Sequence, residues 1–563
     1  MTMTRIEALK LLTAPGEPYE LMEVDLYGHP CRAFRNAPPT LRDLFESTRS
    51  DLDFIVFEDE RLTFEGTWAQ AARLAHHLYH DLGLRHGDRV AISMRNYPEW
   101  IISFMAVTSI GGIVVAMNAL WQPGEMDYAL NDSQPRVAIL DQERIDRLVQ
   151  CQRLPRGLAV MAVRPAKPLP PGMTEWHEAL SGIGSVAMPE VDLDPNDDAT
   201  ILYTSGSTGY PKGAVSCHRN IISALLSWEL DYQASSVSGL VGPPDPDAPQ
   251  TAALLGVPLF HVAGSHAVYL ASYRSQRRLV CMYKWDVDRG AELIERERVS
   301  MFVATPAITG DLVAAAPTLN RDLSSLALVG GGGAPRAPEQ VRNIDKNFAN
   351  ALPNTGWGMT ETNAIGTGIA GADYLQRPES SGRVSAVLDI KIVDEAGNTL
   401  APRQRGELLV RGTSVIRGYW HRPDANRTTF QDGWMRTGDV AYLDEEGFLF
   451  IVDRIKDLVI RGGENIGCGS VEAALLEHPS ILEACVYGVP DDRLGEEVGA
   501  TLYITGPIDE DELRAFLKER LAAFEIPRYY IFFEEPLPRT ASGKIYKREL
   551  RAAASEQWGK GKG

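Results

Sequence analysis

The stretch ILYTSGSTGYPKGAV, residues 201–215, decides how the rest of the chain is interpreted. An apolar strand end, 201–203, leads into a loop in which hydroxyl residues alternate with glycines, and Lys212 follows a proline. Glycines let backbone N–H groups approach a phosphate, hydroxyls add hydrogen-bond donors, and a lysine adds positive charge. Pro211 before the lysine and Gly213 after it do not fit the Walker A pattern G-x-x-x-x-G-K-[ST]. A linker rich in serine and glycine is the alternative, but linkers seldom follow a strand. The stretch therefore predicts a phosphate-binding loop of another kind.

On both sides of this loop, helices alternate with short apolar strands, which is the pattern of parallel βαβ layers. We expect a helix over 68–82, strands over 89–93 and 137–140, and a second alternating block over about 251–350. Short strands with glycine turns over 380–450 indicate a β-rich subdomain. The predicted class is α/β, with a large N-terminal domain (1–455) of two α/β layers plus the β-rich subdomain. A small α+β C-terminal domain (456–563) follows.

One run, 100–120, carries no charge and is long enough to span a bilayer. Gly111 and Gly112 interrupt it, so we expect a buried helix followed by a strand over 113–115, and no transmembrane segment. The start, MTMTRIEALK, has a glutamate where a secretory signal needs an apolar run, so we do not expect a secreted protein.

The composition is ordinary for a globular enzyme, with 44% of the 563 residues hydrophobic and 23% charged. A net charge of −19 argues against a protein that coats nucleic acid, because it repels phosphate backbones. The six cysteines are scattered and form no C-x-x-C pair, which is typical of a reduced, cytoplasmic protein.

Further segments carry a set of motifs in a fixed order along the chain. They are VPLFHVAG (257–264), GGGAP (331–335), TGWGMTET (355–362), GELLVRG (406–412), GYW (418–420), GWMRTGD (433–439), DRIKDLVIRGGENI (453–466) and PRTASGK (538–544). With YTSGSTGYPKGAV they resemble the signature of the adenylate-forming superfamily. This superfamily comprises acyl- and aryl-CoA synthetases, nonribosomal adenylation domains and beetle luciferases. The resemblance implies two steps. A carboxylate attacks the α-phosphate of ATP to give acyl-AMP and pyrophosphate, and a thiol then displaces AMP. Such transfers rely on positioning and charge neutralisation.

The resemblance also implies which residues bind ATP and Mg²⁺. Nucleotide contacts would come from Thr204, Ser205, Gly206, Ser207, Thr208, Gly209, Lys212, Gly332, Gly333, Ala334, Pro335, Thr355, Gly356, Trp357, Gly358, Thr360, Asp439, Arg454 and Lys544. Asp439 and Arg454 would meet the ribose, and Thr360 the α-phosphate. Thr204 and Glu361 would lie near Mg²⁺, which prefers oxygen ligands. Many relatives have glutamine at the place of Thr355, so one adenine hydrogen bond is left without a donor or acceptor.

Catalysis, by the same resemblance, depends on a mobile C-terminal domain. Lys544 would bridge the charge between carboxylate and α-phosphate in the first step, with Thr360 and Glu361 as further catalytic residues. Lys456 matches the hinge about which the domain rotates before the second step. That rotation would bring Gly462, Gly463 and Glu464 to the tunnel for CoA.

The acid itself is expected in an apolar pocket, which favours fatty or aryl acids. Its predicted lining is Phe260, His261, Ser265, Thr305, Gly331 and Met359. Two positions depart from the pattern of the superfamily. Its long-chain enzymes have a gating tryptophan at the place of Ser265, and its members usually have a glutamate at the place of Ser470. His218 is expected only to cap or pack a helix.

The leading hypothesis is an ATP-dependent acid–CoA ligase that acts on a medium- or long-chain fatty acid or an aryl acid. A free-standing adenylation enzyme that loads a phosphopantetheinyl carrier protein is the alternative. A sensor that has lost catalysis is the third, although it predicts degraded motifs, whereas Lys212, Glu361, Asp439 and Lys544 are present. A homodimer is the default expectation for the assembly.

Overall fold

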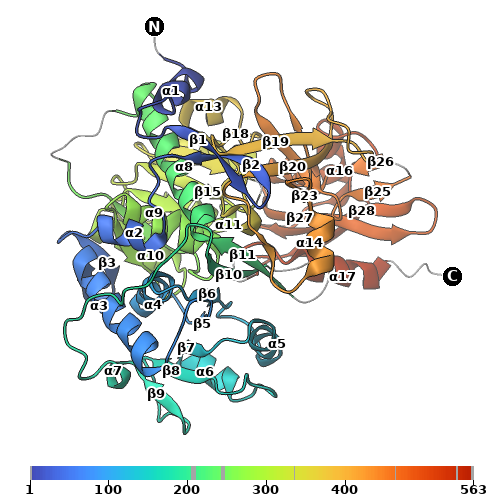
Figure 1. Ribbon diagram of the computed structural model, residues 1–563. Coiled ribbons are helices and arrows are strands. Elements are labelled where there is room, and N and C mark those ends of the chain that lie inside the picture. The colour runs from blue at the N-terminus through green and yellow to red at the C-terminus, as the bar shows by residue number, and fades with distance from the viewer. Residues whose placement is uncertain are drawn as a thin grey trace.

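The computed structural model describes residues 3–204, 211–242, 248–334, 336–462, 464–540 and 543–558. Two large sheets, both mostly parallel, make up the first part of the chain, and two smaller sheets follow (Figure 1). The segment from about residue 456 onward, orange to red in Figure 1, lies on one side of the molecule. The predicted α/β class with a β-rich part and a small C-terminal α+β part is confirmed.

The first large sheet contains the strand that leads into the phosphate loop. Its strand order is β21 (Gly418–Tyr419), β11 (Lys212–Cys217), β10 (Asp198–Thr204), β6 (Ile113–Ala116), β5 (Arg89–Ser93), β7 (Val137–Asp141), β8 (Ala159–Val163) and β9 (Met173–Glu175). From β10 to β9 neighbouring strands are parallel. Their apolar side chains are almost continuously buried, as expected for a sheet covered on both faces.

The second large sheet carries most of the glycine-rich motifs. Its order is β18 (Arg383–Val384), β17 (Thr367–Ala370), β16 (Leu352–Gly356), β15 (Leu328–Gly332), β14 (Met301–Val303), β12 (Ala252–Leu255), β13 (Arg278–Cys281), β3 (Asp53–Phe57) and β4 (Glu60–Thr63). The strands from β16 to β3 are parallel, so their carboxyl ends meet at one edge. Ligand sites of open α/β sheets lie at that edge.

The uncharged run 100–120 folds as predicted. Helix α4 (Pro98–Ser109) has all its residues buried, and Gly111, whose φ of +75° favours glycine, lies between its C-cap Ile110 and the start of β6. A side chain on Gly112 would come within 2.8 Å of Val107. In the described ranges, no helix has the length and apolar character needed to cross a membrane.

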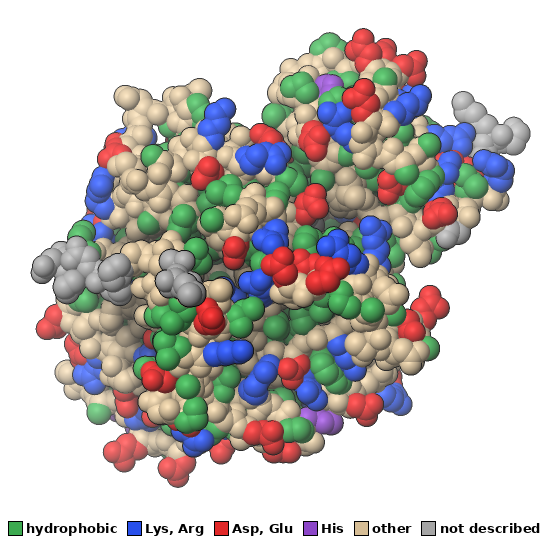
Figure 2. All heavy atoms as spheres, turned by 90° about the horizontal axis from the view of Figure 1, so that it is seen from above, with side chains coloured by type: hydrophobic (Ala, Val, Ile, Leu, Met, Phe, Trp, Pro, Cys, Tyr) green, Lys and Arg blue, Asp and Glu red, His purple; other side chains and the backbone are tan. Residues whose placement is uncertain are grey.

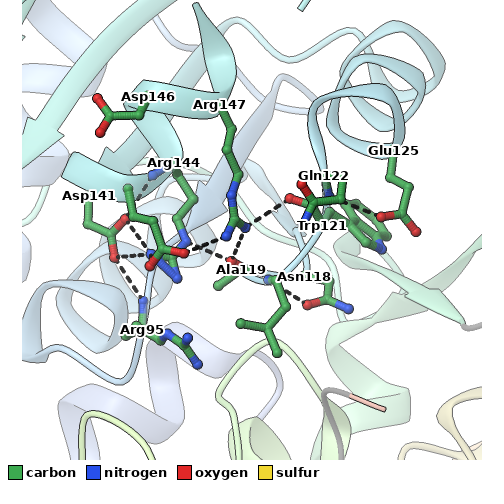
Figure 3. A network of polar contacts seen from close by, with 12 residues as sticks. Arg95, Asn118, Ala119, Trp121, Gln122, Glu125, Asp141, Arg144, Asp146 and Arg147 are labelled. Carbon is green, nitrogen blue, oxygen red and sulfur yellow. Dashed lines mark hydrogen bonds and ion pairs between the residues drawn. The ribbon is translucent and has the colours of Figure 1, made fainter. Parts of the chain in front are cut away.

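A buried ionic network holds the loop 117–122, between β6 and α5 (Pro123–Ser133), as Figure 3 shows. On α6 (Gln142–Leu148), the fully buried Arg144 pairs with Asp141 at 3.0 Å, and its Nε donates to the carbonyl of Ala119 at 2.7 Å. Arg147 donates to the carbonyls of Ala119 and Trp121 at 2.8 and 2.9 Å. A buried guanidinium is tolerated only when it is paired and hydrogen-bonded. The network therefore fixes this loop, whose Trp121 ring packs edge-on against Tyr203 beside the phosphate loop.

The β-rich part is an antiparallel sheet of β19 (Leu388–Val393), β20 (Gly406–Gly412), β23 (Trp434–Leu443), β22 (Phe430–Gln431) and β24 (Leu449–Arg454). The last sheet contains β26 (Glu464–Ile466), β25 (Val459–Arg461), β28 (Gly495–Ile504), β27 (Ile481–Asp491) and β29 (Tyr529–Phe533). Helices α15 (Cys468–Leu476), α16 (Glu510–Lys518) and α17 (Lys547–Trp558) accompany that sheet, and its buried apolar residues form cores separate from those of the large sheets.

Candidate active site

The carboxyl ends of β10, β14, β15 and β16 open into a single cavity of about 3030 Å³. Side chains from the C-terminal segment close part of it, Lys544 and Arg539 among them. Acidic and basic side chains are mixed over the face seen from above (Figure 2). The cations of the cavity are therefore not an extension of a basic surface on that face.

The phosphate side of the cavity is lined by Thr204, Lys212 and Glu361. Lys212 Nζ lies 4.8 Å from the centre of the Tyr419 ring, and the Tyr419 hydroxyl donates to Glu361 Oε1 at 2.7 Å. One tyrosine thus orders the predicted phosphate lysine and the predicted metal-ligand glutamate. Five other predicted phosphate-loop residues, Ser205 to Gly209, lie outside the described residues.

Glu361 belongs to a short 3-10 helix, Thr360–Thr362, that follows β16 and places Met359 and Thr360 on the cavity wall. Only 7% of Glu361 is exposed, and Oε1 alone is used by Tyr419. An aqueous Mg²⁺ bound to phosphates needs only one or two protein oxygens. The carboxylate of Glu361 and the hydroxyl of Thr204 fit that requirement.

Asp439 is the most strongly fixed acid of the site. It is 3% exposed, its Oδ2 accepts from Trp357 Nε1 at 2.7 Å, and its Oδ1 pairs with Arg454 Nε at 2.7 Å. Burial raises the pKa of Asp439, and the charge of Arg454 acts in the opposite direction. Each oxygen keeps a lone pair, so the carboxylate can still accept two hydroxyls.

Glycines bring three strands unusually close beside Asp439. Gly331 has a φ of +128°, and a Cβ there would lie 2.2 Å from the carbonyl oxygen of Ala304. A Cβ on Gly332 would lie 2.6 Å from the carbonyl of Gly356. The Thr355 hydroxyl donates to the Gly331 carbonyl at 2.9 Å, so it is used inside the protein. Gly332, Gly333, Ala334, Thr355, Gly356, Trp357 and Gly358 all line the cavity, and Pro335 lies outside the described residues.

Lys544 reaches the same place from the C-terminal segment. Its Cε lies 3.6 Å from where a Cβ on Gly333 would be, and Asp439 and Glu361 attract its charge. Burial lowers the pKa of the Lys544 ammonium, and Arg454 acts in the same direction. Gly543 before it has a φ of +80° and lies against Thr305. The described conformation thus places this lysine at the nucleotide side of the cavity.

On the acid side, His261, Thr305, Gly331 and Met359 line the cavity as predicted, but Phe260 and Ser265 do not. Phe260 is 4% exposed and packs against the His261 ring, with 4.7 Å between ring centres. Ser265 is 1% exposed and donates to the His261 carbonyl at 3.0 Å. Its predicted place in the pocket is therefore wrong, because it is turned into the protein. Burial lowers the pKa of His261 to about 4, so the ring is neutral at pH 7, and its Nε2 has no hydrogen-bond partner within the described ranges.

Two helix faces of this cavity were not predicted from the sequence. Ala263, Ala267 and Ala271, spaced by four along the π-helix η2 (Ala263–Leu270) and α9 (Ala271–Arg274), line one wall. Leu225, Trp228 and Tyr232 line another from α8 (His218–Val237). Their helical spacing in the sequence is the signal that could have identified them. His218 itself starts α8, and its Nδ1 accepts from the Leu41 N–H at 3.2 Å, so its expected capping role is confirmed.

Two of the three residues predicted for the CoA tunnel, Gly462 and Glu464, do not lie at the cavity. Gly462 and Glu464 are exposed on the β25–β26 hairpin and do not line it, and Gly463 lies outside the described residues. Lys456, predicted as the hinge, does line the cavity, and burial lowers the pKa of its ammonium. This arrangement presents Lys544, rather than the β25–β26 hairpin, to the nucleotide side.

Buried histidines predict a particular response to acid. Burial lowers the pKa of His218, His261 and His266 from the ordinary 6.5 to about 4. Between about pH 4 and pH 6.5 these histidines are protonated in the unfolded chain but neutral in the folded protein, so the unfolded chain binds more protons. The free energy of unfolding should therefore fall as pH drops from about 6.5 towards 4, by up to about 1.4 kcal/mol per pH unit for each histidine.

Urea unfolding across this pH range measures the slope. The control is His218→Asn, whose side-chain oxygen can still accept from Leu41 but does not titrate. In His218→Asn, the slope of the free energy of unfolding against pH should be smaller than in the wild type by the contribution of one proton. An unchanged slope would contradict the burial of His218.

Comparisons with known proteins agree with this geometry. The family model described as AMP-binding enzyme matches residues 45–420, and that described as AMP-binding enzyme C-terminal domain matches 470–544. A long-chain-fatty-acid–CoA ligase of Bacillus subtilis is 31% identical, covering 90% of this chain and 92% of its own length. A feruloyl-CoA synthase of an Amycolatopsis species is 33% identical, covering 87% and 93%. A solved o-succinylbenzoate–CoA synthetase of Bacillus subtilis, in complex with its acyl-adenylate, aligns with a TM-score of 0.76 at 27% identity, covering 91% of this chain and 98% of its own.

Proposed function

Since the chain belongs to the AMP-binding enzyme family, as an AMP-forming acid–CoA ligase, we propose that its acid is a medium- or long-chain fatty acid or an aryl acid. The observation that carries this proposal is the apolar extension of the cavity past His261, between α8 and η2. Leu225, the Trp228 ring and the three alanines of η2 and α9 present mainly apolar surface to the acid, and the indole N–H of Trp228 is the one polar side-chain group among these five residues. Burial of an apolar chain there contributes roughly 25 cal/mol per Å².

In the first step, the acid carboxylate lies between Thr305, Gly331 and the nucleotide, and its oxygen attacks the α-phosphorus as pyrophosphate leaves. Lys544 neutralises the charge shared by the carboxylate and the α-phosphate. Asp439 orients the ribose hydroxyls. Thr204 and Glu361 would hold Mg²⁺, which supplies charge neutralisation for the phosphates when bound.

In the second step, CoA thiol displaces AMP from the acyl carbon. We assign this step to a rotation of residues 456–563 about Lys456, which withdraws Lys544 and brings in the β25–β26 hairpin with Gly462, Gly463 and Glu464. The exposed position of Gly462 and Glu464, outside the cavity lining, supports this assignment, because this stretch is free to serve another step. The domain division, a cytoplasmic location and a homodimer stay predictions.

Pyrophosphate release with a panel of carboxylic acids tests the function. Fatty and aryl acids should give kcat/KM values at least about 100-fold above those of short hydrophilic acids and amino acids, since each buried methylene is worth about 0.8 kcal/mol. A preference for an amino acid would contradict the proposal. CoA and a phosphopantetheinylated carrier protein, each added to preformed acyl-AMP, distinguish the two acceptors, and AMP release with the carrier alone would favour the adenylation enzyme.

A further inference from the structure

The cavity does not end at the acid pocket. It continues along the face of the second large sheet to the amino ends of β12 and β13, where Thr251, Arg277 and Ser300 line it. Thr251 lies just before β12 and Val257 two residues after it, and six residues of extended chain correspond to about 20 Å. A ligand that fills this length therefore presents its far end to a second, distant set of side chains.

That far end carries an excess of positive charge. Two arginines line it, Arg274 and Arg277, together with one carboxylate, Glu229. Arg274 pairs with Glu229 at 2.9 Å, so this carboxylate already has a partner.

Arg277 is the arginine at this end that has no carboxylate partner among the described residues. It is partly buried just before β13 and, in the part of the chain that the structure describes, its guanidinium has neither an ion pair nor a hydrogen bond. The side chain nearest in charge is Tyr232 of α8, and burial lowers the pKa of the guanidinium. The nitrogen atoms of Arg277 are not fully enclosed by the described residues, so the guanidinium is open to the cavity and can bind an anion there.

We propose that Arg277 binds an anionic group at the far end of the acid substrate, so that the enzyme accepts long α,ω-dicarboxylic acids. This inference rests on the proposed function and specifies its substrate class. A guanidinium matches a carboxylate in a two-pronged, charge-assisted contact, which a methyl or methyl ester end cannot make. One carboxylate is activated beside Lys544, and the other remains bound by Arg277.

The test compares long α,ω-dicarboxylic acids with their ω-monomethyl esters, which have the same length without the second charge. The wild-type enzyme should show a kcat/KM ratio of about tenfold in favour of the diacid at some chain length. In Arg277→Gln the ratio should fall to near one. Arg321→Gln, at a surface arginine outside the cavity, should keep the wild-type ratio.

Calorimetric titration of the same ligands with wild-type and Arg277→Gln protein gives an answer that needs no turnover. A failure of every acid to release pyrophosphate would overturn the proposed function alone, whereas equal binding of diacid and ester by the wild type would overturn this inference. A diacid preference that survives in Arg277→Gln would also overturn it. Arg277-dependent binding to phosphatidylserine vesicles without a diacid preference would reassign the arginine to a membrane surface.

Discussion

Lys544→Ala is expected to lower the rate of acyl-AMP formation by at least about 10²–10³-fold, while acyl-AMP supplied from outside is still converted to the thioester. The reason is that Lys544 lies beside Gly333, within electrostatic reach of Asp439 and Glu361. In the proposed mechanism it neutralises charge that develops only in the first step. Pyrophosphate exchange measures the first half-reaction, and AMP release from acyl-AMP plus CoA measures the second.

Lys518→Ala is the matched control, because Lys518 is an exposed lysine in the last turn of α16 in the same segment. It should retain both half-reactions. If Lys544→Ala impaired the two half-reactions to a similar extent, the lysine would have a general structural role and not the assigned one.

Asp439→Asn should raise the KM for ATP about 100-fold. The two oxygens of Asp439 accept from Trp357 Nε1 and Arg454 Nε, both at 2.7 Å. Asparagine keeps one oxygen, so its NH₂ must face one of these two donors, and a buried donor without an acceptor costs about 1–3 kcal/mol. The ribose hydroxyls also lose a charged acceptor. Initial rates of pyrophosphate release over a range of ATP concentrations give the value.

Trp357→Phe separates the two contributions. It removes one donor to Asp439 but leaves the carboxylate and Arg454, so we expect a rise in KM of about tenfold only. A Trp357→Phe defect equal to that of Asp439→Asn would show that the tryptophan, rather than the carboxylate, carries the nucleotide contact.

Much of the fold followed from local patterns in the sequence. The strands β5 and β7 and the break at Gly111 lie where apolar runs and glycines predict them, because these patterns act over a few residues. The nucleotide side was predictable for a different reason, since its motifs keep their order along the chain, and the structure places Asp439, Glu361 and Lys544 around one cavity.

The acid side was harder to predict. Ser265 was placed in the pocket because it lies four residues after His261 in the sequence. The chain there forms the π-helix η2, whose turns are wider than those of an α-helix, so a different set of side chains faces the cavity. Ala263 and Ala267 line the cavity instead. The pairing of Arg274 with Glu229, which leaves Arg277 without a carboxylate partner among the described residues, joins residues 45 positions apart and has no signal in a single sequence.

The contact between the C-terminal segment and the rest of the chain has a consequence for turnover. Among the described residues, the one ion pair that joins 456–558 to the residues before them is Arg539 with Asp311, at 4.0 Å, while Arg539 also pairs with Glu483 in its own segment. A long, half-exposed pair is worth about 0–1 kcal/mol. The rotation proposed for this segment would therefore cost little in broken ionic contacts. The balance between the two orientations should be set by which of acyl-AMP or CoA is bound, and it should depend only weakly on salt.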